Sequence, residues 1–388
     1  MSANRGSPGM WLPWLMRWRD LVRLASNSSA NARRPRRGRA GNPRESRPAG
    51  LATEMLEVRL VPSALSPLPT QPHRILQHAA ITVQQASPET RKALIAPAAL
   101  RRSVTTTRLP IAPRQQWNEN NGYCGETSIQ SCALYFGTYV SQYRVRAFIN
   151  PDQQSQLLIG VNEQTALRAL HLTFEQWNSR NPIPQWQNYL GWVKRSIQKG
   201  NPVIGTMYIK GMTDLDYDHI VPIVGVRSSF NARRYHGSDT LLFNDNFNTT
   251  TLARTFGTLA ATRQIANSGR FKYSIPSRVD YGCAVTGIVD TLRETVPVRL
   301  QVDRSSEPNL IAGAQPVTMN ATLTIQSLVP GKTYSLLRYD DPARVPDSGF
   351  LARGGYASAR TFTATTTTQT LTDQFSSNGV VTYRCVAS

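Results

Sequence analysis

Apolar residues recur at the spacing of an α-helix in four stretches in the middle of the chain. The first predicted helix has Cys124 at its N-cap or in its first turn, carries Ile129 and Leu134 on one side, and ends at Gly137. Three further amphipathic helices are predicted over residues 141–149, 161–172 and 185–198. The last of them has aromatic residues on its apolar stripe, a pattern typical of a helix that packs on a core.

Short runs rich in β-branched and aromatic residues lie between and after these helices. The central runs cover residues 203–209, 220–226, 240–243 and 281–289, and the C-terminal runs cover residues 296–302, 321–325, 333–339 and 361–368. A chain of 388 residues exceeds the ~250–300 that one core usually supports. We therefore expect an α+β domain over residues 115–290, followed by a small all-β sandwich over residues 293–388.

Positive charge is concentrated at the N-terminal end. The chain carries a net charge of +20, and residues 1–114 hold 19 Lys and Arg against 5 Asp and Glu, a net of +14. This segment is rich in Arg, Pro, Gly and Ser, so we expect a disordered basic arm and linker there. Nucleic acid is not an expected partner, because no recognition motif follows in the rest of the chain. No transmembrane segment is expected either, since no apolar run reaches ~18 residues.

One segment of the arm has a pattern of its own. Residues 56–64 read Leu-Glu-Val-Arg-Leu-Val-Pro-Ser-Ala and follow an Arg-rich stretch. They resemble the Leu-Glu-x-Arg-Leu-hydrophobic-Pro-Ser/Ala segment near the N-terminus of many exported planctomycete surface proteins. The resemblance implies that the protein is exported to the cell envelope or to the outside of the cell.

The predicted position of Cys124 suits a nucleophile. Four cysteines are too few for a disulfide scaffold, and Cys124 opens a predicted helix whereas Cys132 lies eight residues further along it. Unpaired N–H groups and the helix dipole at a helix N-terminus stabilise a thiolate, which is the reactive form. We therefore expect a lowered pKa for Cys124. The alternative is a small buried cysteine at the start of a core helix.

A nucleophilic cysteine needs a base and a group that orients the base. His219 comes at the start of an apolar β run, and the next strand ends in Asn244, Asp245 and Asn246. Either Asn244 or Asp245 could accept the His219 N–H and fix its tautomer. The alternatives are a structural histidine and an ordinary turn, since Asn and Asp favour turns.

This order resembles that of the papain-like cysteine peptidases: a cysteine-bearing helix, a histidine that opens a strand, and Asn or Asp at the end of the next strand. The closest likeness is to the double-glycine leader peptidase branch, on Cys124-Gly125, the His219 strand and Asp245. Gln116 resembles the oxyanion-hole glutamine of that family, although it precedes Cys124 by eight residues rather than six. Asn118 stands six residues before Cys124 and is the alternative amide donor.

The resemblance implies a papain-like domain with a helical half and an antiparallel sheet. It also implies a hydrolase that cleaves peptide or amide bonds of a peptide or protein substrate through a Cys-His-Asp/Asn triad, without a cofactor or a metal. An acyltransferase on the same fold would use the same Cys124 and His219. A catalytically inactive surface binding protein is the third possibility.

The C-terminal segment has a resemblance of its own. Residues 328–334 read Leu-Val-Pro-Gly-Lys-Thr-Tyr and resemble the Leu-x-Pro-Gly-x-x-Tyr turn of fibronectin-type-III-like sandwiches. Such sandwiches usually bind a partner or act as spacers, so we expect no catalytic chemistry from residues 293–388.

Overall fold

A computed structural model of the chain describes residues 103–118, 122–149, 160–210, 217–230, 233–259 and 272–388. All of them belong to one compact unit, Pro88–Ser388. The export-like segment and the rest of the predicted arm up to residue 102 lie outside the described residues.

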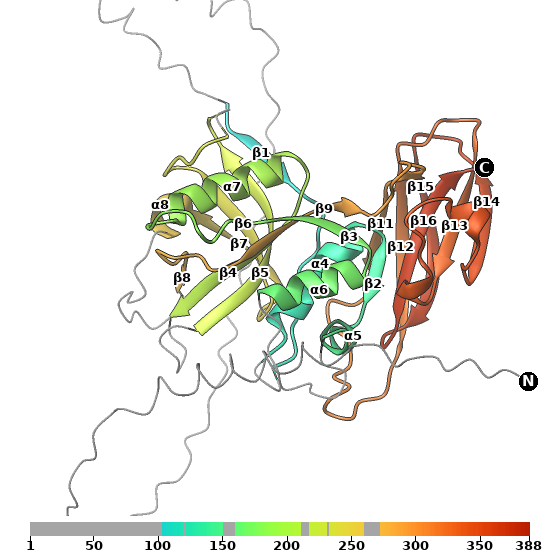
Figure 1. The fold of residues 1–388 in the computed structure, drawn as a ribbon, viewed down its shortest axis with the longest axis horizontal. Helices are drawn as coiled ribbons and strands as arrows, with labels where there is room; N and C mark the ends of the chain where they lie inside the picture. Colours follow the sequence, from blue (N-terminus) through green and yellow to red (C-terminus); the bar gives the residue numbers. More distant parts are fainter. Residues whose placement is uncertain (1–102, 119–121, 150–159, 211–216, 231–232, 260–271) are drawn as a thin grey trace, which may run out of the picture. The chain divides into compact units, whose positions relative to one another are not determined.

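The central part of the chain alternates helices and strands, labelled as in Figure 1. The helices are α4 (Cys124–Tyr135), α5 (Gln142–Ala147), α6 (Val161–Ala169), α7 (Trp186–Gln198) and α8 (Phe256–Leu259). The strands are β1 (Thr105–Arg108), β2 (Thr138–Val140), β3 (Leu172–Gln176), β4 (Val203–Lys210), β5 (Tyr217–Ser228), β6 (Thr240–Asp245), β7 (Thr250–Thr255), β8 (Lys272–Ser274) and β9 (Gly282–Ile288).

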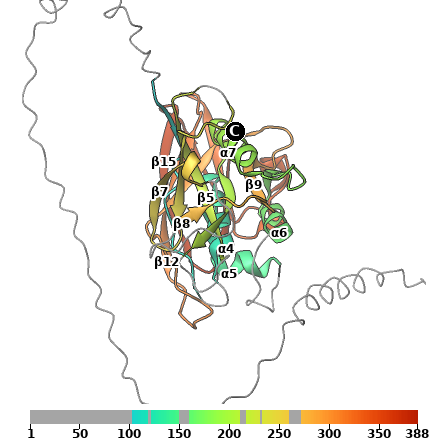
Figure 2. The ribbon, with the colours of Figure 1, turned by 90° about the vertical axis from the view of Figure 1, so that its left-hand side faces the viewer.

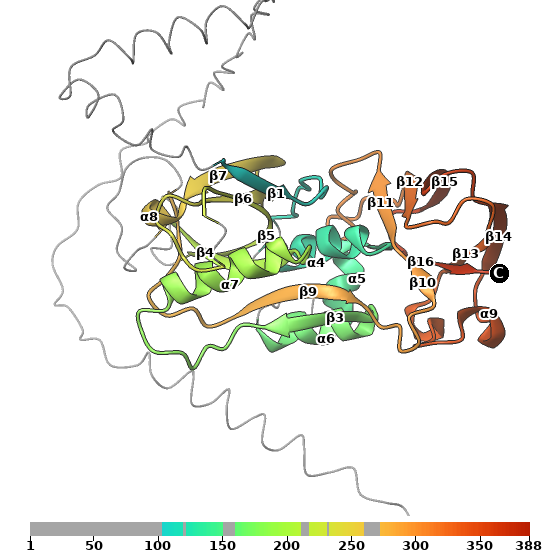
Figure 3. The same ribbon diagram turned by 90° about the horizontal axis from the view of Figure 1, so that it is seen from above.

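These strands form an antiparallel sheet in the order β3-β9-β4-β5-β6-β7, with β1 paired to β5 and β8 paired to β4. Successive residues of a strand point to opposite faces. Val203 packs in a core with α7, whereas Ile204 packs in a second core with α4 and α6. The sheet is thus covered on both faces, and α7 lies above α4 and α6 in Figures 1 and 2. Figure 3 shows the pair β3 and β9 beside α6.

The ordered domain begins before residue 115, so the expected end of the linker is wrong. Residues 103–114 include β1, which pairs with β5 from Thr105 opposite Ser228 to Arg108 opposite Gly225. A side chain at Gly225 would meet the Thr107 carbonyl oxygen at 2.8 Å. The absence of a side chain at this position therefore lets β1 approach β5. A four-residue strand of mostly exposed, polar residues carries too little pattern to be predicted.

The C-terminal part forms two further antiparallel sheets. Its elements are β10 (Thr295–Val296), β11 (Val298–Val302), β12 (Thr318–Gln326), β13 (Thr333–Tyr339), η2 (Pro342–Arg344), α9 (Phe350–Arg353), β14 (Ser358–Thr363), β15 (Thr368–Ser376) and β16 (Val380–Ala387). One sheet has the order β10-β16-β13-β14, and the other has the order β11-β12-β15. Side chains of both sheets, among them Leu323 and Tyr383, share one core, as in a sandwich.

This sandwich-like part is not separate from the central part. Strand β2, which follows α4 directly, pairs with β16 and completes the five-stranded sheet, so that Val140 lies opposite Val380. In Figure 1 β2 lies beside the C-terminal strands. The strand after the candidate cysteine helix is therefore built into the C-terminal sheet.

The structure confirms a mixed α and β fold with antiparallel sheets, but three predicted elements are wrong in extent. The helix predicted over residues 161–172 ends at Ala169, because His171 has a positive φ of 52° and β3 follows. Pro297, which has no N–H to donate, divides the strand predicted over residues 296–302 into β10 and β11. The strand predicted over residues 361–368 instead spans the turn between β14 and β15. Within the described residues, no helix is long and apolar enough to cross a membrane.

Candidate active site

Cys124 is the first residue of α4, as the pattern predicts, and irregular backbone precedes it. Gly122 has a φ of +79°, a conformation that favours glycine. The Arg146 guanidinium lies 3.6 Å from the centre of the Tyr123 ring, donates to the Gly122 carbonyl oxygen and pairs with the buried Glu126 carboxylate. These contacts fix the two residues directly before Cys124.

The thiol environment differs from the expectation of a lowered pKa. Burial raises the pKa of Cys124 to about 12, and the Glu126 and Glu163 carboxyls add to the rise. Hydrogen bonds from the backbone N–H groups of Ile220 and Gly125 oppose it but are outweighed. The side chain is almost enclosed, with 5% of the residue exposed. In the described state the helix N-terminus therefore holds a neutral thiol, because burial outweighs the helix N–H groups.

His219 lies on β5 and faces the end of β6. Its Nε2 is 3.7 Å from Oδ1 of Asp245, an ion-pair distance that is too long for a hydrogen bond, and both side chains are buried. Neither Nδ1 nor Nε2 has a hydrogen-bond partner among the described residues. The Phe247 ring stacks on the imidazole at 4.3 Å between centroids. Burial lowers the pKa of His219, while the Asp245 carboxylate opposes this shift, so the imidazole is neutral at pH 7.

The structure brings Asp245 rather than Asn244 to His219. Although burial raises the pKa of Asp245, the nearby His219 ring and hydrogen bonds from the Phe247 N–H, Asn248 and Tyr273 outweigh it and hold that pKa below its ordinary value. The carboxylate is therefore charged at neutral pH.

Asn244 has a structural role instead. Its amide donates to the Ile111 carbonyl oxygen at 3.0 Å, and its oxygen accepts from the Thr251 hydroxyl at 2.8 Å. Neighbouring residues of a strand point to opposite faces, so only one of Asn244 and Asp245 can face His219.

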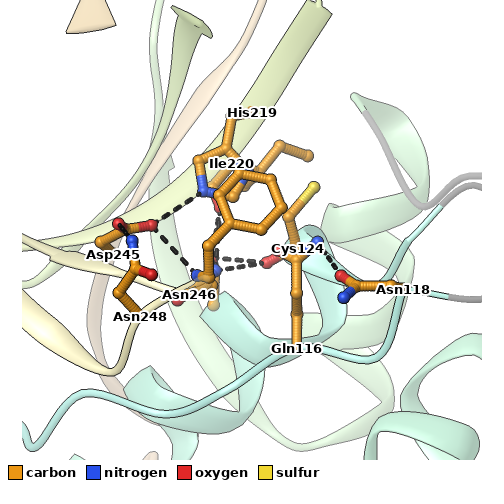
Figure 4. Close-up of polar contacts among 10 residues, drawn as sticks. Gln116, Asn118, Cys124, His219, Ile220, Asp245, Asn246 and Asn248 are labelled. Carbon is orange, nitrogen blue, oxygen red and sulfur yellow. Dashed lines mark hydrogen bonds and ion pairs between the residues drawn. The ribbon is translucent and has the colours of Figure 1, made fainter. Parts of the chain in front are cut away.

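Gln116 is buried in the segment before α4, and its side chain extends toward Cys124 in Figure 4. Its Nε2 lies 3.5 Å from Oδ1 of Asn118, and its Oε1 has no hydrogen-bond partner among the described residues. Asn118 itself is exposed. Of the two amides expected as oxyanion donors, Gln116 is the buried one and Asn118 is its neighbour.

Asn246 joins these parts, and the sequence gives no indication of this role. Its Nδ2 lies 3.1 Å from the Cys124 carbonyl oxygen, 3.0 Å from the Ile220 carbonyl oxygen and 3.3 Å from the Ser128 hydroxyl. The main-chain carbonyl oxygen of Asn246 accepts the Gln116 N–H. Because carbonyl oxygens only accept, they fix the orientation of the amide. Asn246 thus links the cysteine helix, the histidine strand and the Gln116 segment (Figure 4).

Glu163 on α6 is a second residue that the pattern does not reveal. It is fully buried, and neither carboxyl oxygen has a hydrogen-bond partner among the described residues. Burial, and then the charge of Glu126, raises its pKa well above the ordinary value. A single Glu in the first turn of an amphipathic helix is usually exposed, so nothing in the sequence marks it.

The described residues contain no group of three His, Cys, Asp or Glu side chains placed to hold a metal ion. All four cysteines are free and buried. The chemistry that the arrangement itself offers is a thiol, a neutral imidazole, a charged carboxylate and a buried amide, joined through Asn246.

Comparison with known proteins adds no assignment. No model of a protein family matches the chain, and no curated protein matches it either.

Proposed function

We propose that this protein is a cysteine hydrolase with a papain-like catalytic domain, which cleaves peptide or amide bonds with Cys124 as nucleophile, His219 as base and Asp245 as the group that orients the base. The observation that carries the proposal is the state of the His219 ring. Neither ring nitrogen has a hydrogen-bond partner among the described residues, and of the two it is Nε2 that faces the Asp245 carboxylate, at 3.7 Å. This leaves Nδ1 as the nitrogen that can take a proton from a thiol.

The raised Cys124 pKa and the lowered His219 pKa favour general-base catalysis over a preformed thiolate–imidazolium pair. His219 takes the thiol proton as the sulfur bonds to the substrate carbonyl carbon. The carbonyl oxygen becomes an oxyanion, which Gln116 Nε2 and the Cys124 N–H would stabilise, an effect typically worth ~10²–10³ in rate.

The intermediate then collapses. The C–N bond breaks, the leaving amine takes the proton from the imidazolium, and a thioester remains on Cys124. Water attacks the thioester while His219 accepts one of its protons. The acid product leaves as that proton returns to the sulfur, so the free thiol is restored.

A catalytically silent binding protein is the second candidate. The nearly enclosed Cys124 side chain, with its raised pKa, favours this alternative. An acyltransferase is chemically equivalent up to the thioester and differs only in the acceptor, an amine in place of water.

We propose export to the cell envelope or the outside on the sequence pattern of residues 56–64 alone. Deletion of these nine residues is expected to retain the protein inside the cell, as measured by cell fractionation. Normal export of the deletion variant would contradict this part of the proposal.

The test of activity uses the full chain with a mixed peptide library. New N-termini are identified by mass spectrometry, with and without a primary amine as acceptor. We expect cleavage that is lost in Cys124→Ala and in His219→Ala but retained in the control Cys132→Ala, a second buried cysteine of the same helix. Cleavage that survives Cys124→Ala contradicts the proposal. Amide products formed with the added amine identify an acyltransferase.

A further inference from the structure

The short segment that carries Gln116 is held at each of three consecutive residues. The Gln142 side chain accepts from the Trp117 N–H at 3.0 Å and donates to the Gln115 carbonyl oxygen at 2.9 Å. The Gln116 N–H donates to the Asn246 carbonyl oxygen at 3.0 Å. The main chain around Gln116 is thus fixed in place, whereas among the described residues the Gln116 side chain has a hydrogen bond only with Asn118, at 3.5 Å.

The group behind this arrangement comes from the C-terminal part of the chain. Glu307, in the connection between β11 and β12, is buried, and its carboxylate accepts from the Gln142 N–H, the Gln130 amide at 2.9 Å and the Tyr139 hydroxyl at 2.6 Å. Its carbonyl oxygen accepts from the Trp117 indole N–H at 3.2 Å. Glu307 therefore bonds to the Trp117 side chain and also to Gln142, whose side chain accepts from the Trp117 main chain.

Two residues shortly before Glu307 also form hydrogen bonds with the segment that carries Gln116. The Ser305 carbonyl oxygen accepts from the Gln115 N–H, and the Arg304 carbonyl oxygen accepts from the Arg114 guanidinium at 2.9 Å. Arg114 also donates to Gln130. One side of the segment before α4 is therefore formed by residues 304–307.

We propose that Glu307 is a positioning residue for the oxyanion donor Gln116, and that the C-terminal sandwich is a working part of the catalytic centre. This inference rests on the proposed function, because it assigns Glu307 a role in that reaction. It departs from the expectation that the sandwich only binds or spaces.

The physical reason is that the Gln116 side chain can stabilise an oxyanion only if its main chain stays in place. A displacement of about 1 Å in a catalytic group can cost on the order of 10² in rate. In Glu307→Gln one of the two carboxylate oxygens becomes an NH2 group, so either the Gln142 N–H or the Tyr139 hydroxyl loses its acceptor, and the segment that they support relaxes.

The test measures peptide cleavage by the full chain carrying Glu307→Gln. It also measures Trp117→Phe, which removes the indole donor and leaves a smaller buried ring. We expect kcat to fall about ten- to a hundredfold for Glu307→Gln and less for Trp117→Phe, with KM little changed. The matched control is Asp303→Asn, which makes the same change of charge in the same connection but at a side chain bonded to Asn320. This control should keep its kcat.

A double-mutant cycle separates positioning from general stability. In a Gln116→Ala background, Glu307→Gln is expected to change kcat by less than about twofold, because the group that it positions is gone. An equal loss of kcat with and without Gln116 overturns the inference but leaves the proposed function standing. If the wild-type chain cleaves nothing, the proposed function fails instead.

Amide hydrogen exchange gives a reading that needs no turnover. Glu307→Gln should speed exchange at Gln116 and Trp117 while leaving β5 and β6 unchanged. Unchanged exchange at these two residues overturns the inference whether or not the protein is active.

Discussion

The described part of the chain contains two pairs of a histidine and an aspartate. The two pairs consist of the same residue types but differ in distance and in exposure to water. His171 and Asp347 approach to 3.2 Å with side chains that are 23% and 59% exposed. His219 and Asp245 lie 3.7 Å apart with side chains that are 0% and 2% exposed. The pair with the shorter distance is solvated, whereas the other is enclosed beside the Cys124 helix.

The comparison shows that distance alone does not identify a catalytic pair. Water screens His171 and Asp347, and surface pairs of this kind contribute about 0–1 kcal/mol. Around His219, burial and the Asp245 carboxylate act in opposite directions on one imidazole, so its protonation depends on a single neighbour. Changes around the buried pair should therefore have large effects and changes at the exposed pair small ones.

The largest effect is expected from Asp245→Asn. Loss of the carboxylate removes the charge that holds His219 in its tautomer and stabilises the imidazolium, so cleavage should fall on the order of 10²–10⁴-fold. The pKa of His219 should fall further, since the group that raises it is gone. Peptide cleavage and NMR titration of His219 measure the two effects. An Asn244→Ala variant that loses as much activity as Asp245→Asn would contradict the assignment.

The pH dependence of cleavage follows from the same group. A general base must be neutral, and burial lowers the pKa of His219 below about 6.5. Activity should hold as the pH falls to 6.5 and decline only below it. A decline that begins well above pH 6.5 would show that another group controls the reaction.

Asn246→Ala should have the next largest effect. The Cys124 and Ile220 carbonyl oxygens lose their shared donor, at a cost of about 1–3 kcal/mol in the free energy of unfolding. Cleavage should fall about ten- to a hundredfold, because the cysteine helix and the histidine strand are no longer tied together. Urea unfolding and cleavage assays measure both. Asn246→Ser, with a hydroxyl in place of the amide, should retain more activity than Asn246→Ala, and the reverse order would argue against the role.

Glu163→Gln should change the pH dependence of stability. The folded-state pKa of Glu163 lies well above its unfolded value, so the folded state binds more protons between the two values. The free energy of unfolding therefore falls as the pH rises through that window. Glu163→Gln should be more stable than the wild type at pH 8, by about 1 kcal/mol or more, and nearly equal at pH 4. If urea unfolding gives Glu163→Gln and the wild type equal stability at both pH values, the Glu163 pKa is not raised in the folded state.

The smallest effect is expected at the exposed pair. His171→Ala should change the free energy of unfolding by less than about 0.5 kcal/mol and leave cleavage unchanged, because water screens its partner Asp347. The same two assays measure it. A loss of activity comparable with that of Asp245→Asn would remove the contrast between the pairs.

Local pattern was enough to place the three residues of the proposed triad on their elements. Cys124 opens α4, His219 lies near the start of β5, and Asp245 ends β6, each as the apolar spacing predicts. The choice between Asn244 and Asp245 stayed open, because it depends on which face of β6 meets β5. Only the three-dimensional pairing decides that.

The rest depends on contacts between distant parts of the chain. Strand β2 pairs with β16 across more than 200 positions, and Glu307 reaches the Gln142 N–H from a connection that reads as an ordinary loop. Burial by such contacts also raises the pKa of Cys124, whereas the sequence predicts a lowered pKa. The position of a residue in a helix can be read from the local sequence, but its burial depends on distant segments. Periodicity reports neighbours along one element and carries no information about such pairs.

The most direct test of the nucleophile–base pair is the rate at which iodoacetamide alkylates Cys124 at pH 7 in the full chain, with and without His219. Mass spectrometry follows Cys124 and Cys132 in the wild type and in His219→Ala, so that the second buried cysteine of α4 serves as the internal standard. We predict that Cys124 reacts faster than Cys132 and that His219→Ala removes this advantage. Equal rates for Cys124 with and without His219 would contradict the pair and leave a surface binding protein as the better account.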